Sequence, residues 1–284
     1  MPESPSPEDQ PLASVSVIVP TKDSARTLAR CLESIQAAAK VARAAGVETE
    51  SIVVDNPGSQ DATSEIAAQL ADRLAIKGPE RSAQRNHGAE LATGDVVVFI
   101  DSDMVLESDM TLDVARLFGR DPAVGAAVLP EYAFGEGFLA SCRVLEKQLY
   151  LGDDAVEAAR AFRTTAFVEV GGYERALVGP EDWELPERVR DRGWAVARTP
   201  AGVWHDEGRI DLGAQFKKKR YYGRSIGQYR RMRPADARGH FRRSSLIRQP
   251  GLLARHPLEA VGLAVLKSVE ATGILMGMWD TRKS

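Results

Sequence analysis

Short apolar runs rich in β-branched residues alternate with segments of helical periodicity along the first half of the chain. Each apolar run predicts a buried strand, and the runs lie at 14–20, 50–55, 95–101 and 123–130. The helical segments lie at 24–44, 79–94 and 109–120, with a further helix after the turn at Pro57 and Gly58. We expect Ser24 to cap the first helix and Gly94 to end the third. This alternation predicts an α/β fold with a mainly parallel sheet.

The pattern changes after residue 130. Helices are predicted at 137–150, 164–173 and 181–193, and an extended segment is predicted at 194–205. A long basic amphipathic helix follows at about 212–232, and an apolar helix at 256–279 closes the chain. In that last helix Glu259, Lys267 and Glu270 fall within an arc of about 80°. Its wide apolar face is expected either to pack on the domain or to lie in a membrane interface.

The charge of the chain is unevenly distributed. Although the net charge of the 284 residues is −3, residues 209–255 contain fourteen lysines and arginines and only two aspartates. A basic segment on an acidic body favours an anionic membrane or a phosphate-rich partner, with a solvated basic face as the alternative. The small overall charge argues against nucleic acid as a partner.

The two cysteines and the N-terminal residues indicate the cellular compartment in which the protein is expected. Cys31 and Cys142 lie in apolar helical patterns without metal-type spacing, so we expect core thiols in a reducing cytoplasm. Residues 1–12 are acidic and rich in proline, without the basic and apolar regions of a signal peptide. They predict a disordered lead.

Polar side chains follow the predicted strands where each strand ends. Asp101 and Asp103 come directly after the apolar run "VVVFI", and in a turn both carboxylates can face one ligand. Paired carboxylates repel each other unless a positive charge lies between them, and all-oxygen ligation suits Mg²⁺ or Mn²⁺. Because the carboxyl ends of parallel strands form the ligand crevice, these residues predict a metal–diphosphate site. Helix capping by Asp103 is the alternative.

Five segments in succession strengthen the metal–diphosphate interpretation. They are "SVSVIVPTKDSARTLARCLESI", "VVDNPGSQDAT", "RNHGAELATGDVVVFIDSDM", "GGYERALVGPEDWEL" and "VWH". Together they resemble the family-2 glycosyltransferases, which are inverting enzymes of the GT-A fold. The resemblance covers residues 14–206 and implies one Rossmann-like nucleotide-binding sheet with flanking helices, followed by a C-terminal helical extension. We therefore expect a lead at 1–12, a GT-A domain at 13–207 with a nucleotide-sugar half (13–130) and an acceptor half (131–207), and the extension at 208–284.

The resemblance also implies roles for individual residues. Residues expected to contact the nucleotide sugar are Pro20, Thr21, Asp23, Asp55, Arg81, Arg85, Asn86, Asp101 and Ser102. Asp55 would accept the imide N–H of uracil, Asp103 and His205 would hold Mn²⁺ or Mg²⁺, and Asp182 would be the catalytic base. Weaker candidates for acceptor binding are Glu181, Trp183, Tyr222 and Arg224.

Each of these roles has a structural alternative. Asp182 at a helix start can favour the helix dipole, and a lone histidine such as His205 is often structural. Trp183 can belong to the core, and Tyr222 and Arg224 can belong to a solvated helix face. The loop "VDNPGSQDAT" is one residue longer than the usual "VDDGSTDGT" type, and Pro186 directly after "EDWEL" is unusual.

The expected activity is transfer of one sugar from a nucleoside-diphosphate sugar to an acceptor hydroxyl. UDP is preferred over GDP on family frequency, and the absence of a "QxxRW" sequence argues against processive synthesis. A non-catalytic nucleotide-sugar-binding or scaffold protein and a nucleotidyltransferase are the alternatives. The basic segment and the apolar helix, residues 209–279, suggest a cytoplasmic protein at the inner membrane face with a lipid-linked acceptor.

Overall fold

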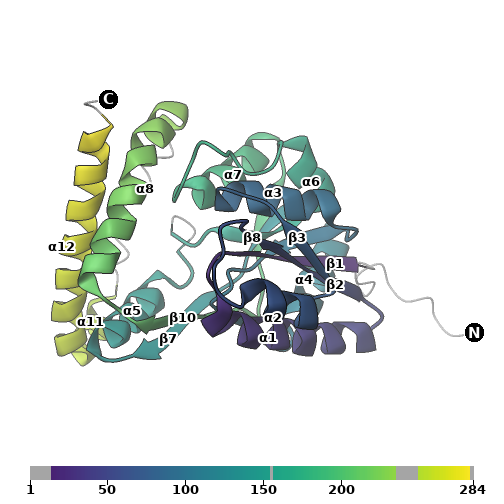
Figure 1. The fold of residues 1–284 in the computed structure, drawn as a ribbon, viewed down its shortest axis with the longest axis horizontal. Coiled ribbons are helices and arrows are strands. Elements are labelled where there is room, and N and C mark those ends of the chain that lie inside the picture. The colour runs from purple at the N-terminus through teal and green to yellow at the C-terminus, as the bar shows by residue number, and fades with distance from the viewer. Residues whose placement is uncertain (1–13, 154–155, 235–248, 282–284) are drawn as a thin grey trace, which may run out of the picture. The chain divides into compact units, whose positions relative to one another are not determined.

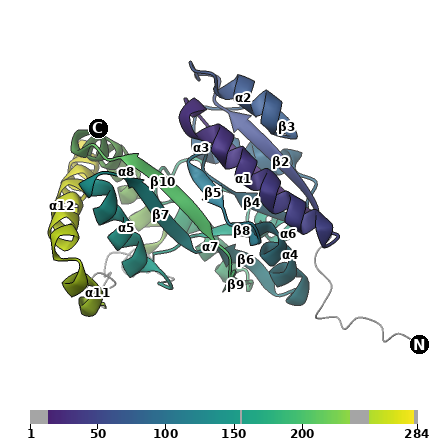
Figure 2. The same cartoon turned by 90° about the horizontal axis from the view of Figure 1, so that it is seen from below.

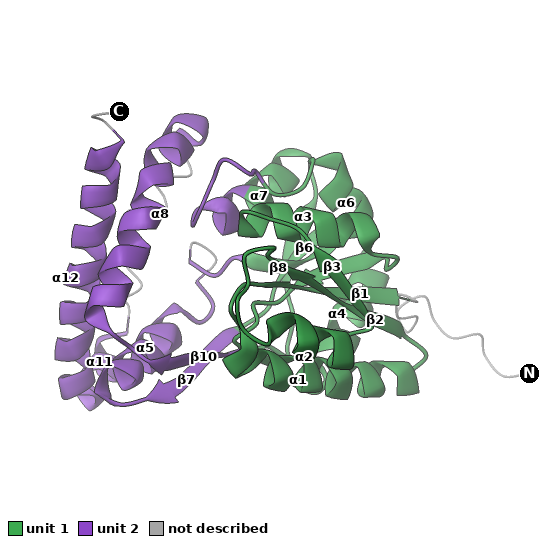
Figure 3. Cartoon of the chain, viewed as in Figure 1, with its two compact units in different colours: residues 1–130, 159–173, 185–203 green, residues 131–158, 174–184, 204–284 purple. Residues whose placement is uncertain are grey.

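The computed structural model describes residues 14–153, 156–234 and 249–281, so the predicted lead at 1–12 lies outside the described residues. The chain forms two compact units that interleave along the sequence (Figure 3). Unit 1 comprises 1–130, 159–173 and 185–203, and unit 2 comprises 131–158, 174–184 and 204–284.

Unit 1 is built on a sheet in which seven strands are described, in the order β3-β2-β1-β4-β8-β6-β9. These strands are β1 (Ser14–Thr21), β2 (Glu48–Asp55), β3 (Arg73–Ile76), β4 (Val96–Phe99), β6 (Val124–Val128), β8 (Ala159–Arg163) and β9 (Ala195–Arg198). The central strand β1 pairs in parallel with β2 and β4, which brings the carboxyl ends of all three to one edge. Only β8 runs antiparallel to its neighbours in this described sheet, and it lies between β4 and β6.

Helices cover both faces of this sheet (Figures 1 and 2). On one face are α1 (Ala25–Ala44), α2 (Thr63–Leu70) and α4 (Met110–Arg120). On the other are α3 (Arg81–Leu91), α6 (Thr164–Glu169) and the later residues of α7 (Glu181–Asp191). Successive side chains of each strand point to opposite faces of the sheet and contribute to two separate apolar cores. The predicted α/β architecture is therefore confirmed.

The structure corrects several local expectations. The strands β3, β8 and β5 (Met104–Leu106) were not predicted from the sequence. Ser24 occupies the N-cap position of α1, but its side chain makes no capping hydrogen bond. Gly94 does not cap α3, which ends at Ala92 in an extended conformation. Instead, a Cβ at Gly94 would lie 2.6 Å from the backbone nitrogen of Ser16, so this glycine allows a close approach to β1.

Unit 2 contains the strands β7 (Glu131–Glu136) and β10 (Val203–Arg209), which are neighbours in a second sheet. Its helices are α5 (Phe138–Tyr150), α8 (Leu212–Met232), α11 (Pro250–Arg255) and α12 (Pro257–Asp280). The predicted long helices at 212–232 and 256–279 therefore form, and they lie side by side (Figures 1 and 2). Part of the predicted basic segment, residues 235–248, lies outside the described residues.

Helices α8 and α12 pack backbone against backbone. A Cβ at Gly223 would lie 2.4 Å from the carbonyl oxygen of Ile274, and a Cβ at Gly277 would lie 2.0 Å from that of Arg220. Both distances are far below van der Waals contact, so only glycine allows this separation. The guanidinium of Arg220 also pairs with the carboxylate of Asp280, with N–O distances of 2.8 and 3.0 Å.

The charged stripe of α12 faces the protein. Glu270, which is 2% exposed, accepts hydrogen bonds from Arg143 of α5 at 2.5 Å and from Lys267 at 2.7 Å. Lys267 also donates to Glu146 of α5 at 2.7 Å, and Arg143 pairs with Glu146. The alternation of charge within this cluster compensates the cost of burying each group. Leu263 and Leu266 of α12 are also buried, and Leu263 packs with Cys142 and Leu145 of α5, so α12 is docked on unit 2 through charged and apolar side chains together.

The cluster favours the ionised form of Glu270, whereas burial disfavours that of Lys219. Burial raises the pKa of Glu270, but attraction from Lys219, Lys267 and Arg143 outweighs it and lowers the pKa to about 2. Burial likewise lowers the pKa of Lys219 to about 8, although Glu270 acts against that shift. Since the folded pKa of Glu270 lies below its ordinary value of 4.5, its ionised form stabilises the fold above pH 4.5, and this contribution is lost as the pH falls through 2.

We predict that Glu270→Gln lowers the free energy of unfolding by about 3 kcal/mol at pH 7, because Arg143, Lys219 and Lys267 lose a shared buried partner. The difference from the wild type should shrink as the pH falls from 4.5 towards 2. Urea denaturation at pH 7 and pH 3 measures both effects. Glu259→Gln, on the same helix, is the control and should change stability little. A deficit of equal size at both pH values would contradict the assigned ionisation.

Candidate functional site

The carboxyl ends of β1 and β2 are tied together by Gln84 of α3. This side chain is 3% exposed, and its Nε2 donates to the carbonyl oxygens of Thr21 and Val54, both at 2.7 Å. Pro20 and Thr21 are aligned with Val54 and Asp55 in the parallel register. Gln84 was not singled out in the sequence, because a glutamine inside a helical pattern carries no signal of its own.

Asp55 is buried at the end of β2 and organises the loop after it. Its Oδ1 accepts hydrogen bonds from the hydroxyls of Thr21 and Ser59 at 2.8 and 2.7 Å and from the backbone N–H of Asn56 at 2.9 Å. Its Oδ2 accepts from the hydroxyl of Ser64 at 2.6 Å. These four donors give Asp55 a structural function in the loop, while its contact with a base stays a prediction.

Asp101 lies at the end of β4 among three arginines. Its Oδ1 is 2.9 Å from Nη2 of Arg85 and 3.6 Å from Nη1 of Arg81, and its Oδ2 is 3.3 Å from Nη1 of Arg160. Arg85 is fully buried, and its guanidinium lies 5.0 Å from the ring centroid of Tyr173. Three guanidinium groups therefore surround Asp101 at this end of the sheet, and guanidinium groups suit an anionic ligand. Arg160, on β8, was missed by the sequence analysis.

Asp103 and Ser102 lie just beyond Asp101, close to the start of α1. The hydroxyl of Ser102 donates to that of Ser24 at 2.9 Å. Beneath the two aspartates lies the thiol of Cys31, whose sulfur is 3.7 Å from the carbonyl oxygen of Asp101. Burial, together with repulsion from Asp103 and Asp101, raises the pKa of Cys31 and keeps it a thiol. Cys31 and Cys142 are buried free cysteines, as predicted.

Two other predicted donor-site residues have structural contacts. Asn86 exchanges two hydrogen bonds with the backbone of Tyr173, at 2.9 and 2.8 Å, so its amide anchors the turn at Gly171 and Gly172. Asp23 adopts a φ of 49°, in the left-handed region, and its carboxylate accepts from the N–H of Gln60 at 2.8 Å. Left-handed aspartates are uncommon outside turns, and such strain tends to occur at functional sites.

In unit 2, His205 of β10 is held by a carboxylate. Its Nδ1 is 2.9 Å from Oε1 of Glu131 on β7, and that oxygen also accepts from Nζ of Lys147 at 2.5 Å. Metal-bound histidines usually donate their second ring N–H to such a carboxylate, so the donor set fits a metal bound through Nε2. Among the described residues, no group of three or more His, Cys, Asp or Glu side chains is already arranged around a metal position.

The predicted base and acceptor residues also belong to unit 2. Glu181, Asp182 and Trp183 form the first turn of α7, with Glu181 buried and Asp182 half-buried. The indole N–H of Trp183 donates to the carbonyl oxygen of Val156 at 3.3 Å. Tyr222 of α8 packs against Gly179, where a Cβ would lie 2.9 Å from the tyrosine ring.

Arg224 follows Tyr222 by two residues on α8, and its Nη2 is 3.8 Å from Oδ2 of Asp280. Thus Asp103 lies in unit 1, whereas Asp182 and His205 lie in unit 2.

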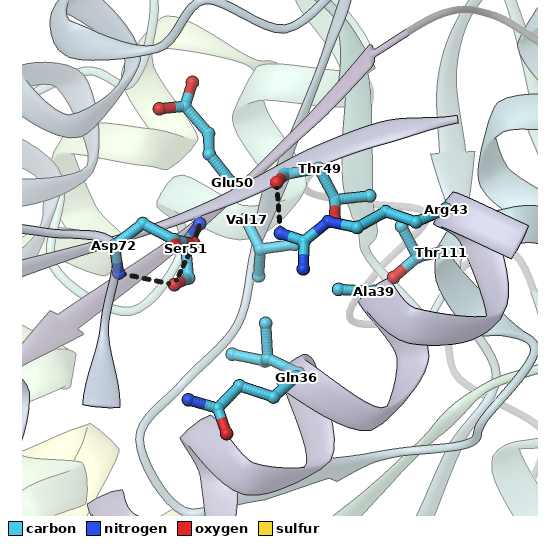
Figure 4. A pocket seen from close by; sticks show the side chains of 10 residues that line it. Val17, Gln36, Ala39, Arg43, Thr49, Glu50, Ser51, Asp72 and Thr111 are labelled. Atoms are coloured by element: carbon cyan, nitrogen blue, oxygen red, sulfur yellow. Dashed lines mark hydrogen bonds between the residues drawn. The ribbon is translucent and has the colours of Figure 1, made fainter. Parts of the chain in front are cut away.

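A cavity of about 250 Å³ lies in unit 1 between α1 and the strands β1 and β2 (Figure 4). Its walls include apolar side chains of the core and the polar side chains of Arg43, Thr49 and Asp72. None of the predicted site residues lines it, so this cavity is separate from the candidate site at the strand ends.

The chain is 26% identical over 234 residues to the pre-mycofactocin glycosyltransferase of Mycobacterium tuberculosis, covering 74% of this chain and 46% of that protein. The chain spans only 35% and 46% of the length of the first curated relatives that it matches.

Two solved structures share the fold. One is the mannosyltransferase PcManGT from Pyrobaculum calidifontis in complex with GDP-Man and Mn²⁺, with a TM-score of 0.58, 21% identity, and coverage of 97% of this chain and 83% of that chain. The other is glucosyl-3-phosphoglycerate synthase from Mycobacterium tuberculosis with Mn²⁺, UDP and phosphoglyceric acid, with a TM-score of 0.52, 17% identity, and coverage of 76% and 78%. Residues 16–159 match the family described as Glycosyl transferase family 2, and the chain therefore belongs to that family.

Proposed function

We propose that the protein is an inverting glycosyltransferase that moves one sugar from a nucleoside-diphosphate sugar to an acceptor hydroxyl. The observation that carries this proposal is the group of three arginines around Asp101 at the carboxyl edge of the sheet. In open α/β sheets ligands bind at this edge, and guanidinium groups suit the oxygens of a diphosphate. Membership of the family supports the same reaction class.

The donor site is proposed to use the ends of β1, β2 and β4. Arg81 and Arg160 are the partly accessible cations beside Asp101, and they would bind phosphate oxygens while the buried Arg85 holds Asp101 in place. Pro20, Thr21, Asp23 and Ser102 would line the nucleotide pocket. The comparison structures contain GDP-Man in one case and UDP in the other, and we retain UDP as the proposed nucleotide.

A divalent cation is proposed to complete the donor site. Asp103 and His205 would hold Mn²⁺ or Mg²⁺, the metals named with the solved glucosyl-3-phosphoglycerate synthase. The bound cation would neutralise the charge that develops on the leaving diphosphate. Glu131 would fix the orientation of the His205 ring through Nδ1, and Lys147 in turn would fix Glu131.

Asp182 is proposed as the general base. Asp182 lies in the first turn of α7 and is half-buried, so part of the residue is accessible to an acceptor. It would remove the proton from the acceptor hydroxyl as that oxygen attacks the anomeric carbon from the face opposite the diphosphate, which inverts the configuration. Glu181, Trp183, Tyr222 and Arg224 are proposed to border the acceptor, which we infer to be lipid-linked from the surface properties described below.

The proposal is tested by incubating the protein with a panel of UDP- and GDP-sugars, Mn²⁺ and candidate acceptors. Release of nucleoside diphosphate supports glycosyl transfer. Release of pyrophosphate would indicate a nucleotidyltransferase, and binding without turnover would indicate a non-catalytic protein.

We predict that Asp182→Asn lowers turnover by about 10²–10⁴-fold, because the attacking hydroxyl loses its base. Binding of UDP, measured by calorimetry, should be unchanged. Asp191→Asn, the same substitution at the other end of α7, is the control and should keep full activity. Retained turnover in Asp182→Asn would remove this residue from the mechanism.

We also predict that His205→Ala abolishes binding of Mn²⁺ in the presence of UDP, measured by electron paramagnetic resonance. Glu131→Gln should weaken the same binding by about 10–100-fold, because the histidine loses its orienting carboxylate. Glu136→Gln, at the exposed end of β7, serves as the control. Mn²⁺ affinity that is equal in all three variants and the wild type would exclude His205 as a ligand.

A further inference from the structure

Helix α12 exposes an unusually apolar face. Large apolar side chains with exposed fractions from 37% to 73% lie on it at Leu258, Val261, Val265, Leu275, Met276 and Trp279. At about 100° per residue these six positions fall within an arc of about 100°. Within the described part of the chain, α12 is also the helix whose length and composition would allow it to cross a membrane, and 33% of its most apolar stretch is buried.

The polar face of the same helix points inward. Lys267 and Glu270 are bound to Arg143 and Glu146 of α5, on the side of α12 opposite the exposed apolar residues. A helix on the surface of a protein in water normally has the reverse orientation, with apolar residues towards the core. Two small polar residues, Ser268 and Thr272, also lie on this exposed face, and their hydroxyls donate to the backbone carbonyl oxygens of Ala264 and Ser268. An exposed face with this many large apolar side chains marks an interaction surface.

Basic residues lie beside this face on α8. Lys217, Arg224 and Arg231 are exposed and follow one another at intervals of seven residues, so they form a single stripe along the helix. Arg224 is 3.8 Å from Asp280, which offsets part of its charge. Since α8 and α12 pack backbone to backbone through Gly223 and Gly277, the stripe and the apolar face belong to one rigid helix pair.

We propose that α8 and α12 bind the surface of an anionic lipid bilayer. The apolar face of α12 enters the interface between headgroups and acyl chains, and the stripe on α8 contacts anionic headgroups. Charge decides between this occupant and a second copy of the chain, because two copies joined at this surface would bring like-charged stripes together. The helix lies along the bilayer and does not span it, because spanning would separate Lys267 and Glu270 from Arg143 and Glu146.

This proposal is independent of the proposed reaction, because its test measures binding and not turnover. The full chain is mixed with vesicles of phosphatidylcholine alone or with 30% phosphatidylglycerol, and bound protein is recovered by flotation. We expect binding to the anionic vesicles that weakens as salt is raised towards 1 M. Binding to neutral vesicles should be much weaker.

Substitutions on α12 and α8 test which side chains contact the bilayer. Leu275→Glu should weaken vesicle binding about 30-fold or more, because an inserted apolar side chain is replaced by a charge. The matched control is Val168→Glu, since Val168 in unit 1 is 69% exposed and Leu275 is 65% exposed. Lys217→Gln combined with Arg231→Gln should weaken binding about 30-fold at low salt, with little effect at high salt. These two positions are exposed on α8, so the double variant remains a test if Leu275→Glu does not fold.

Three results would overturn the proposal. One is equal flotation of the wild type and of folded Leu275→Glu. A second is a wild-type dimer, detected by light scattering, that Leu275→Glu converts to a monomer while neither form binds vesicles, which would identify a second copy as the occupant. The third is resistance of the bound protein to extraction at alkaline pH, which would indicate a spanning helix.

Discussion

The ion pair between Asp101 and the buried Arg85 is the interaction on which the candidate donor site depends. Arg85 is fully buried, and a buried guanidinium without a carboxylate partner is strongly destabilising. Asp101 provides that partner and also attracts Arg81 and Arg160, which come from different elements. One carboxylate at the end of an apolar strand therefore gathers three cations at the edge of the sheet. This explains why the four buried residues of β4, followed by the buried Ile100, lead to a charged side chain.

Each unit uses a buried ionic cluster for a different purpose. The cluster in unit 1 places three guanidinium groups around Asp101 where parallel strands end, so it is suited to a ligand with anionic groups. The cluster formed by Arg143, Glu146, Lys267 and Glu270 is internally compensated and joins α5 to α12. Because it satisfies every charged residue in the middle of α12, it leaves the outward face of that helix without charge. Packing inside unit 2 thus determines the chemistry of its surface.

The sequence predicted the central strands and most helices, because periodicity and strand-end chemistry are local signals. It did not predict β8, whose five residues "ARAFR" include two arginines and resemble no ordinary core strand. In the structure Arg160 reaches Asp101, while Arg163 donates to the carbonyl oxygens of Val124 and Phe118. These partners are remote in the chain, so no spacing could reveal them. Similarly, the sequence showed that α12 is amphipathic. It did not show that the charged side of this helix faces inward, because that depends on partners on α5.

The glycine contact between α8 and α12 has a consequence for recognising this helix pair in other proteins. No side chain fits between Gly223 and Ile274 or between Gly277 and Arg220 while the helices keep their separation. A protein with the same helix pair needs glycine at both positions, even where all neighbouring residues differ. These two glycines, about 50 residues apart, can therefore serve as a sequence marker for the hairpin in chains whose overall similarity is too low to align.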